Sequence, residues 1–377
     1  MNASPNTDTA LNNLIRIANQ FKTPGKIIKV EEFGHGNING TFLVTLDSVE
    51  SKHFILQSIN QSVFHKPELV MRNMSTFTNH ARQRLQDSPL TLNRRWEVPL
   101  VLLTQDNQDH FIDSENSFWR AISFIDNAQT FDTIIDNKHA SQVGYALGMF
   151  HNLIGDLPVE KLADTLPGFH VTPIYLEQYE NVQMQDNASS KSPEVKYCLK
   201  FIDRRKTWAH VLENAQMQER LRLRPIHGDP KINNVMIDTS SGEAISIIDL
   251  DTVKPGLVHY DIGDCLRSGC NPLGEETASW EEVAFNSEIC ESLLSGYLSI
   301  AKEFLTESDY IYIYDAIRLI AFELGLRFFT DYLAGNVYFK VKYAEHNLAR
   351  ALVQFKLTES IEMQETAIRK IISTFSK

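Results

Sequence analysis

The order of strand-like and helix-like segments is the strongest constraint that this sequence places on its fold. Three short β-rich runs, IIKVEEF, TFLVTL and HFILQSI, are separated by the turn-like segments GHGNING and DSVESK. This alternation predicts an antiparallel meander over residues 26–59. A helix is expected at residues 67–86, and the strand-like runs VPLVLL, HFID and FWRAISFI follow it.

After Asp126 the pattern changes, because apolar residues recur three and four positions apart, as in SQVGYALGMFHNL. A β-rich insert at residues 224–251 interrupts this helical part. Strands that precede helices in this way are typical of an α+β fold. We therefore predict a small β-rich N-terminal lobe, residues 1–125, and a larger, mostly helical C-terminal lobe, residues 126–377.

The overall composition excludes several classes of partner and location. The formal net charge is −12, whereas nucleic acid and anionic membranes attract basic surfaces. The four cysteines form no CxxC pair, the polar N-terminus does not resemble a signal peptide, and no apolar run is long enough to span a membrane. We expect a cytoplasmic protein with reduced thiols, as a monomer or weak homo-oligomer, whose partner is a small-molecule substrate.

Two short motifs in the β-rich insert indicate the chemistry. HGDPKINN, residues 227–234, precedes a predicted hairpin that ends in IIDLD, residues 247–251. If Asp238 pairs with Ile245, Asn234 lies opposite Asp249, and opposed residues can share a divalent cation such as Mg²⁺. Asp229 then faces the same cavity as a base toward a substrate hydroxyl. The alternative is a polar turn followed by a solvated hairpin.

These motifs, together with YDIGD at residues 260–264, resemble the aminoglycoside phosphotransferase and choline kinase superfamily. The resemblance implies a protein-kinase-like bilobal fold that uses ATP and Mg²⁺. It also implies that Asp229 is the catalytic base, that Asn234 and Asp249 hold the metal, and that His227 braces the loop. Asp251 contacts a second metal or hydrogen-bonds nearby backbone.

Asp261 and Asp264 are more easily explained as structural residues, because an aspartate at the start of a helix caps free N–H groups.

The glycine-rich segment of the first lobe is a candidate phosphate-binding loop, and an ordinary Gly/Asn hairpin is the alternative. We expect Gly34, Gly36 and Asn37 to contact the nucleotide through backbone groups. The strand that supplies a lysine in kinases carries Gln57 instead. The phosphate charge is then met by Mg²⁺ and backbone amides, by Lys231, or by an arginine.

The segment between the two predicted lobes is the candidate hinge for adenine. It lies at residues 119–126, and we expect Ser123 and Ile125 to bind the base through their backbone.

A narrower resemblance covers most of the chain. FILQSIN, PGFHVTP, DLDTVKPG and GLRFFTDYLAGNVYFK are similar to stretches of the N-acetylhexosamine 1-kinases, which share the glutamine. The resemblance implies transfer of the γ-phosphoryl group of ATP to the anomeric hydroxyl of N-acetylglucosamine or N-acetylgalactosamine. Arg327 and Tyr338 would then contact the sugar, and Phe169 and His170 would line its pocket. Ser268 departs from the family, which has an aromatic residue there.

Each of these sugar-site residues also has a structural alternative. Arg327 can form a helix salt bridge with Glu323 or Asp331, Tyr338 can be a core residue, and His170 can be a loop histidine with protein partners. Two further functions remain open: a kinase of the same fold for an aminoglycoside, choline, homoserine or another sugar, and a catalytically weak nucleotide-binding pseudokinase.

Overall fold

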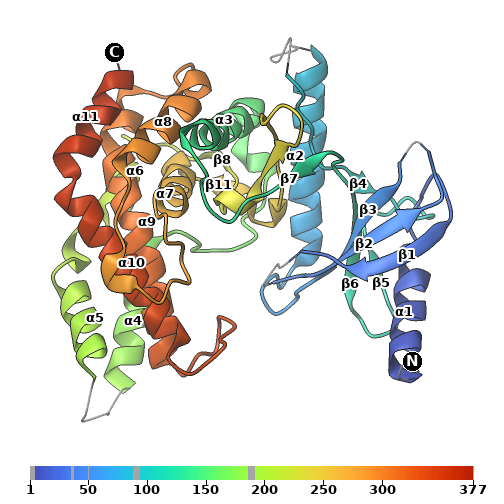
Figure 1. Ribbon diagram of the computed structural model, residues 1–377, viewed down its shortest axis with the longest axis horizontal. Helices are drawn as coiled ribbons and strands as arrows, with labels where there is room; N and C mark the ends of the chain where they lie inside the picture. The colour runs from blue at the N-terminus through green and yellow to red at the C-terminus, as the bar shows by residue number, and fades with distance from the viewer. Residues whose placement is uncertain (1–4, 35–37, 50, 88–93, 186–191, 377) are drawn as a thin grey trace. The chain divides into compact units, whose positions relative to one another are not determined.

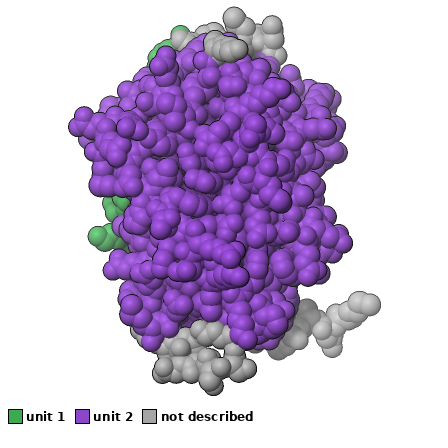
Figure 2. Space-filling view, turned by 90° about the vertical axis from the view of Figure 1, so that its left-hand side faces the viewer, with its two compact units in different colours: residues 1–90, 97–127, 161–166 green, residues 91–96, 128–160, 167–377 purple. Residues whose placement is uncertain are grey.

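The computed structural model describes residues 5–34, 38–49, 51–87, 94–185 and 192–376. The chain divides into two compact units, which Figure 2 distinguishes by colour: unit 1 contains residues 1–90, 97–127 and 161–166, and unit 2 the remainder. We expected one boundary between residues 125 and 126. Instead, residues 91–96 belong to unit 2 and residues 161–166 to unit 1.

Unit 1 is built on one antiparallel sheet with the strand order β1-β2-β3-β6-β4, and β5 pairs with β6 (Figure 1). Its strands are β1 (Ile27–Glu32), β2 (Gly40–Leu46), β3 (His53–Ile59), β4 (Val101–Leu102), β5 (Phe111–Ile112) and β6 (Phe118–Ser123). Its helices are α1 (Pro5–Ala18) and α2 (Pro67–Asp87). The predicted meander and the predicted helix at 67–86 are therefore present.

The two faces of this sheet are covered by different helices. Phe54 and Leu56 of β3 pack in a core cluster that includes Ile17 of α1. Ile59 of β3 and Phe118 of β6 belong to a second cluster, which includes Met71 of α2. Because side chains alternate along a strand, the second face also receives the odd-numbered residues of β3 and the even-numbered residues of β6.

Unit 2 is mostly helical. Its helices are α3 (Asn137–Ile154), α4 (Thr172–Gln185), α5 (Pro193–Asp203), α6 (Val211–Met217), α7 (Val258–Gly269), α8 (Ser287–Ala301), α9 (Glu307–Leu333), α10 (His346–Met363) and α11 (Glu365–Phe375). The long helix α9 packs against α4, α7, α10 and α11. It is apolar on most of its surface, which is the pattern of a helix buried on all sides.

Helices α3 and α8 cross in unusually close contact because each presents a glycine to the other. A Cβ on Gly296 of α8 would lie 1.9 Å from the carbonyl oxygen of Ser141, and a Cβ on Gly144 of α3 would lie 1.9 Å from that of Leu293. Any larger side chain at either position would force the helices apart. This contact fixes α3, which carries His151 toward Asp261 of α7.

Short strands in unit 2 position the motif residues. They are β7 (Ala128–Gln129), β8 (Arg224–Ile226), β9 (Val235–Asp238), β10 (Ala244–Ile247) and β11 (Lys254–Gly256). The predicted hairpin is β9–β10, whereas the pairing of β7 with β9 and of β11 with β8 was not expected from the sequence. The predicted α+β class is confirmed. Among the described residues, none of the helices combines the length and the apolar character that crossing a lipid bilayer requires.

Candidate active site

The loop that carries Asp229 begins directly after β8 and requires a glycine at its second residue. Gly228 has a φ of +86°, a backbone conformation that glycine adopts at little cost. A Cβ there would also lie 2.7 Å from the carbonyl oxygen of Thr252. The loop is thus packed against the turn that follows Asp249, and this contact brings the two motifs together.

A buried carboxylate holds the loop from behind. Asp261 is fully buried and accepts hydrogen bonds from the amides of His227 (2.7 Å) and Gly228 (2.8 Å), and it is 2.9 Å from Nε2 of His151. Nε2 of His227 bonds the carbonyl oxygen of Ile248 at 3.0 Å, so His227 braces the loop as predicted.

The capping role expected for Asp261 is wrong in detail. Helix α7 begins at Val258 and has Leu257 at its N-cap, so Asp261 lies inside the first turn and turns its carboxylate toward the loop.

Asp229 is half-buried and forms an ion pair inside its own loop. Its Oδ2 is 2.6 Å from Nζ of Lys231. Asp229 is the main reason that the pKa of Lys231 is raised, and Asp249 adds to the effect against the opposing effect of burial. Among the described residues no partner of Asp229 Oδ1 is found. That oxygen is therefore the one available to an acceptor hydroxyl.

Asn234 and Asp249 lie close in the fold, but not in the register that we expected. The hairpin pairs Ile247 with Val235, and the amide of Ile248 bonds the carbonyl oxygen of Asn234 at 2.8 Å. Asn234 is thus opposite Ile248 rather than Asp249. The cause is the turn, which closes between Asp238 and Glu243 (N–H to carbonyl oxygen, 2.8 Å) and is thus two residues tighter than expected; an extra residue in β10 between Ala244 and Ser246 recovers one of the two.

The side chains at the end of the hairpin suit a magnesium ion. Nδ2 of Asn234 donates to the carbonyl oxygen of Asp229 at 2.7 Å, which leaves its amide oxygen as a ligand. Asp249 is exposed and lies in the left-handed region at φ 64°. Two oxygen ligands are the usual protein share of a site that Mg²⁺ completes with phosphates and water. Asp251, predicted as a further ligand, is 3% exposed and has an interaction partner inside the protein.

His170, which we predicted as a substrate residue, instead supports the catalytic loop. Its Nε2 is 2.8 Å from the carbonyl oxygen of Gly228, and its Nδ1 is 2.9 Å from Oε1 of Glu323. Burial lowers the pKa of His170, but Glu323, Asp264 and the hydrogen bond to Gly228 together raise it above its ordinary value. Both ring nitrogens are engaged by protein groups, so neither is left to bind a ligand. We correct the assignment to a positioning role.

A column of side chains continues behind His170. Its ring stacks on Tyr260 with 5.5 Å between the ring centroids, and the hydroxyl of Tyr260 donates to Oε1 of Glu213 at 2.8 Å. Burial raises the pKa of Glu213 to about 7. The catalytic loop is therefore coupled through two rings to a carboxyl group that titrates near neutral pH.

Arg327 of α9 is surrounded by aromatic rings. Its guanidinium carbon lies 4.9 Å from the ring centroid of Tyr175, 5.2 Å from that of Phe169 and 5.5 Å from that of Phe339. Neither predicted helix salt bridge forms, because Glu323 is bound by His170 and Thr172. In the described part of the chain no carboxylate lies within ion-pair distance of Arg327.

The electrostatic surroundings keep Arg327 charged. Burial lowers its pKa, but Tyr175, Glu323, Tyr338 and Asp229 together raise it. Arg327 is thus within electrostatic range of the carboxylate of Asp229 and of the phenol group of Tyr338.

The segment that carries Tyr338 is held by one carboxylate. Asp331 accepts hydrogen bonds from the successive amides of Val337, Tyr338 and Phe339 at 2.8–3.0 Å, and from Nδ2 of Asn347 at 2.9 Å. This explains why Asp331 does not pair with Arg327. The side chain of Tyr338 is 57% exposed, so it is not a core residue.

Unit 1 carries the predicted nucleotide residues. Gly34 has a φ of +75°, whereas Gly36 and Asn37 lie outside the described residues. The amide of Ser123 bonds the carbonyl oxygen of Leu100 at 2.8 Å and is thus used within the sheet. For Ile125, no hydrogen bond of its main-chain groups is found over the described ranges, so its backbone remains open to a ligand.

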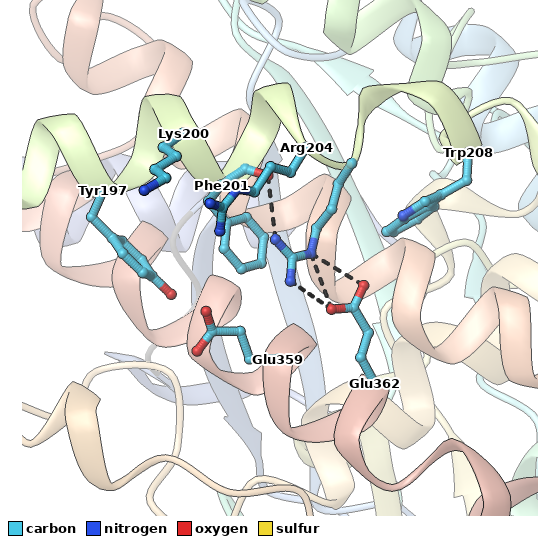
Figure 3. A pocket seen from close by; sticks show the side chains of 8 residues that line it. Tyr197, Lys200, Phe201, Arg204, Trp208, Glu359 and Glu362 are labelled. Atoms are coloured by element: carbon cyan, nitrogen blue, oxygen red, sulfur yellow. Dashed lines mark hydrogen bonds and ion pairs between the residues drawn. The ribbon is translucent and has the colours of Figure 1, made fainter.

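A separate cavity of about 360 Å³ lies in unit 2 between α5, the following turn and α10 (Figure 3). Arg205 stacks on the ring of Phe201 at 3.7 Å and pairs with Glu362 at 2.6 Å across it. Lys200 and Trp208 also line this cavity. None of the predicted site residues belongs to it, so it is distinct from the cluster around Asp229.

The family of the chain follows from a comparison that covers more than half of its length. The model of the phosphotransferase enzyme family (APH) matches residues 29–284. The chain belongs to this family. The matched range contains the loop of Asp229, the hairpin and Asp249, and this assignment confirms that the protein is a phosphotransferase.

Solved structures of small-molecule kinases have the same fold as this APH-family phosphotransferase. An aminoglycoside phosphotransferase from Alicyclobacillus acidocaldarius matches with a TM-score of 0.64 at 13% identity, over 99% of this chain and 98% of that one. A microcompartment-associated aminopropanol kinase gives 0.61 at 16%, over 95% and 98%. A choline kinase from Cryptosporidium parvum gives 0.58 at 14%, over 98% and 100%. The kinase-like fold is confirmed, and the acceptor is not specified, since these proteins are named for different ones.

Some residues with notable surroundings within each unit were not singled out from the sequence. Tyr175 and Phe339, which flank Arg327, resemble ordinary apolar positions of a helix and a loop. Glu213 lies in no sequence motif that would indicate a role for it. Arg120 had a signal, because a charged residue in the apolar strand FWRAIS is unusual, but the sequence did not indicate its partner.

Proposed function

We propose that this phosphotransferase is an ATP-dependent N-acetylhexosamine 1-kinase. In this reaction the oxygen of the anomeric hydroxyl attacks the γ-phosphorus of ATP, and the bond from that phosphorus to the β–γ bridging oxygen breaks. The products are the sugar 1-phosphate and ADP, and the hydroxyl proton passes to Asp229 and then to solvent. The acceptors are N-acetylglucosamine and N-acetylgalactosamine.

The observation that carries the proposal is the charge pairing around Asp229. Lys231 pairs with Asp229, Arg267 with Asp264 at 2.8 Å, and His170 with Glu323. Arg327 has aromatic neighbours instead of a carboxylate in the part of the chain that is described. A charged, half-buried donor of this kind favours a ligand that brings hydrogen-bond acceptors.

This pairing favours a neutral acceptor over a cationic one. The Lys231 and Arg327 side chains both lie in the electrostatic environment of Asp229, and a like charge brought beside them is repelled. Choline and aminoglycosides are cations, whereas an N-acetylated sugar is neutral. Its hydroxyls and its acetyl carbonyl accept hydrogen bonds, and its apolar ring face suits aromatic side chains such as Phe169 and Tyr338.

The remaining roles follow from the same geometry. Oδ1 of Asp229 orients the acceptor hydroxyl and takes its proton, while Lys231 holds the other carboxylate oxygen. Asn234 and Asp249 would hold Mg²⁺, which offsets charge on the phosphate oxygens when it is bound. Gly34, Gln57 and the backbone of Ile125 are proposed to contact the nucleotide, and Gly36 and Asn37 remain predictions from the sequence.

An acceptor screen tests the proposal. Purified protein is incubated with MgATP, and ADP formation is measured with N-acetylglucosamine, N-acetylgalactosamine, glucose, choline, homoserine and an aminoglycoside. We expect turnover with the two N-acetylated sugars. Turnover with choline or an aminoglycoside alone would contradict the charge argument, and nucleotide binding without transfer to any acceptor would indicate a pseudokinase.

A matched control identifies the reacting hydroxyl. The methyl glycoside of N-acetylglucosamine keeps every group of the sugar except the free anomeric hydroxyl. We expect it to bind as a competitive inhibitor and to give no ADP. If the methyl glycoside is phosphorylated, the acceptor is another hydroxyl of the ring.

A further inference from the structure

Gln57 occupies the strand position at which kinases carry the lysine that binds the nucleotide phosphates. In the sheet of unit 1 it stands between Thr41 of β2 and Arg120 of β6, which are its direct cross-strand neighbours. Neighbours of this kind share a face of the sheet. Strand parity places that face with Ile59 and Phe118, on the side covered by α2.

The three side chains form one hydrogen-bonded row. Nε and Nη2 of Arg120 donate to Oε1 of Gln57 at 2.9 and 2.7 Å. Nε2 of Gln57 donates to the hydroxyl of Thr41 at 3.0 Å. Nη1 of Arg120 lies 3.7 Å from the sulfur of Met74 in α2. The forked contact to a single oxygen fixes both the position and the rotation of the Gln57 amide.

This row has only one possible direction. A guanidinium carries donors and no acceptor, so the oxygen of Gln57 must face Arg120 and its nitrogen must face away. The amide nitrogen has two hydrogens, and Thr41 takes one of them. The second hydrogen has no partner among the residues that the structure describes, and Gln57 is only half-buried.

The charge of the row is located one strand away from the glutamine. Arg120 is 1% exposed, and a buried guanidinium that bonds an amide oxygen polarises that amide and makes its N–H groups stronger donors. The pair thus combines a fixed positive charge with a neutral, outward-facing donor. A strand lysine provides the charge and the donor in one group.

We propose that Arg120 is a positioning residue for the nucleotide: it holds Gln57 so that the free amide N–H of Gln57 donates to a phosphate oxygen, and the Gln57–Arg120 pair replaces the missing strand lysine. This inference rests on the proposed kinase activity. It predicts that the two residues act as one unit in nucleotide binding, which a purely structural role for Arg120 does not require.

The first test removes the charge at one end of the row. Arg120→Met keeps an apolar side chain of similar length beside Met74 and releases the Gln57 amide. We expect the KM for ATP to rise about 10- to 100-fold, as the loss of a charge-assisted hydrogen bond implies, with a smaller change in kcat and in the KM for the acceptor. The matched control is Gln83→Met, an exposed glutamine of α2, which should change none of these constants.

The second test rebuilds the usual arrangement. Gln57→Lys alone sets two cations side by side and should weaken ATP binding at least as much as Arg120→Met. The double variant Gln57→Lys, Arg120→Met removes that repulsion and supplies a lysine. We expect it to recover the KM for ATP to within about threefold of the wild-type value, so that the two substitutions are strongly non-additive.

Three outcomes overturn the inference. One is a wild-type KM for ATP in Arg120→Met, the second is strict additivity in the double variant, and the third is a loss of thermal stability with no effect on nucleotide affinity. If Arg120→Met does not fold, the double variant decides. Its lysine at position 57 takes the place of the Gln57 amide, which no longer needs Arg120 to hold it. Calorimetric titration with MgADP needs no acceptor, so it separates failure of this inference from a wrong choice of sugar.

Discussion

Replacement of Glu213 by glutamine should stabilise the protein at alkaline pH and leave it almost unchanged at acidic pH. Oε1 of Glu213 accepts a hydrogen bond from Tyr260, whereas its buried Oε2 has no hydrogen-bond partner in the described structure. Burial therefore raises its pKa from the ordinary value of 4.5 to about 7. Glutamine has nearly the same shape as the protonated acid and keeps an oxygen for Tyr260.

The pKa values set the sign and the size of the effect. Because the folded pKa is raised, the contribution of Glu213 is fully present below pH 4.5 and is lost as the pH rises through about 7. The difference between the two pKa values corresponds to about 3 kcal/mol at pH 8 and to under about 1 kcal/mol at pH 5. Partial solvent contact reduces the gain expected from Glu213→Gln at pH 8 to about 1–3 kcal/mol.

Urea unfolding at pH 5 and pH 8 measures this difference, with Glu291→Gln, an exposed glutamate of α8, as the control. We expect the control to behave as the wild type at both pH values. An equal change in the free energy of unfolding at both pH values, or a loss of stability at pH 8, would refute the reasoning. The reasoning requires that the buried carboxyl group of Glu213 destabilises the protein only when it is ionised.

Three further substitutions test the site and its scaffold. Asp229→Asn should abolish nearly all phosphoryl transfer while calorimetry shows nucleotide binding largely intact; wild-type turnover would remove Asp229 from its catalytic role. Arg327→Met should raise the KM for the acceptor sugar about 10- to 100-fold with little change in the KM for ATP, and equal effects on both substrates would count against a sugar contact. Gly296→Ala should destabilise the protein by about 1–3 kcal/mol or more in urea unfolding, since its Cβ would lie 1.9 Å from the carbonyl oxygen of Ser141, whereas Gly274→Ala meets no atom within 4 Å and is strained only by its φ of +73°.

The sequence was sufficient for features that are local in the chain. The β-rich runs of β1 to β3, the apolar spacing of α2 and α3, and the five-residue spacing from Asp229 to Asn234 all depend on residues near each other in the chain. The structure confirms these elements. The motif that marks the reaction class is also local, which is why it could be recognised before any tertiary contact was known.

Features that depend on distant partners were missed or misplaced. The register of the β9–β10 hairpin depends on a turn that closes at Asp238 and Glu243 and on an extra residue in β10, and the sequence indicates neither of them. Asp261 looked like a helix cap because its true partners, the amides of His227 and Gly228, lie 34 and 33 residues away. His170 looked like a ligand residue for the same reason, because Glu323 is 153 residues further along the chain.

The attachment of the segment around Tyr338 has a consequence for how acceptor preference can change over evolutionary time. Asp331 binds this segment through the main-chain amides of residues 337–339, so these hydrogen bonds do not depend on the side chains of those residues. Substitutions at Tyr338 or Phe339 can therefore alter what the site accepts without loosening the segment. A substitution of Asp331 itself, by contrast, would remove all three of these hydrogen bonds at once.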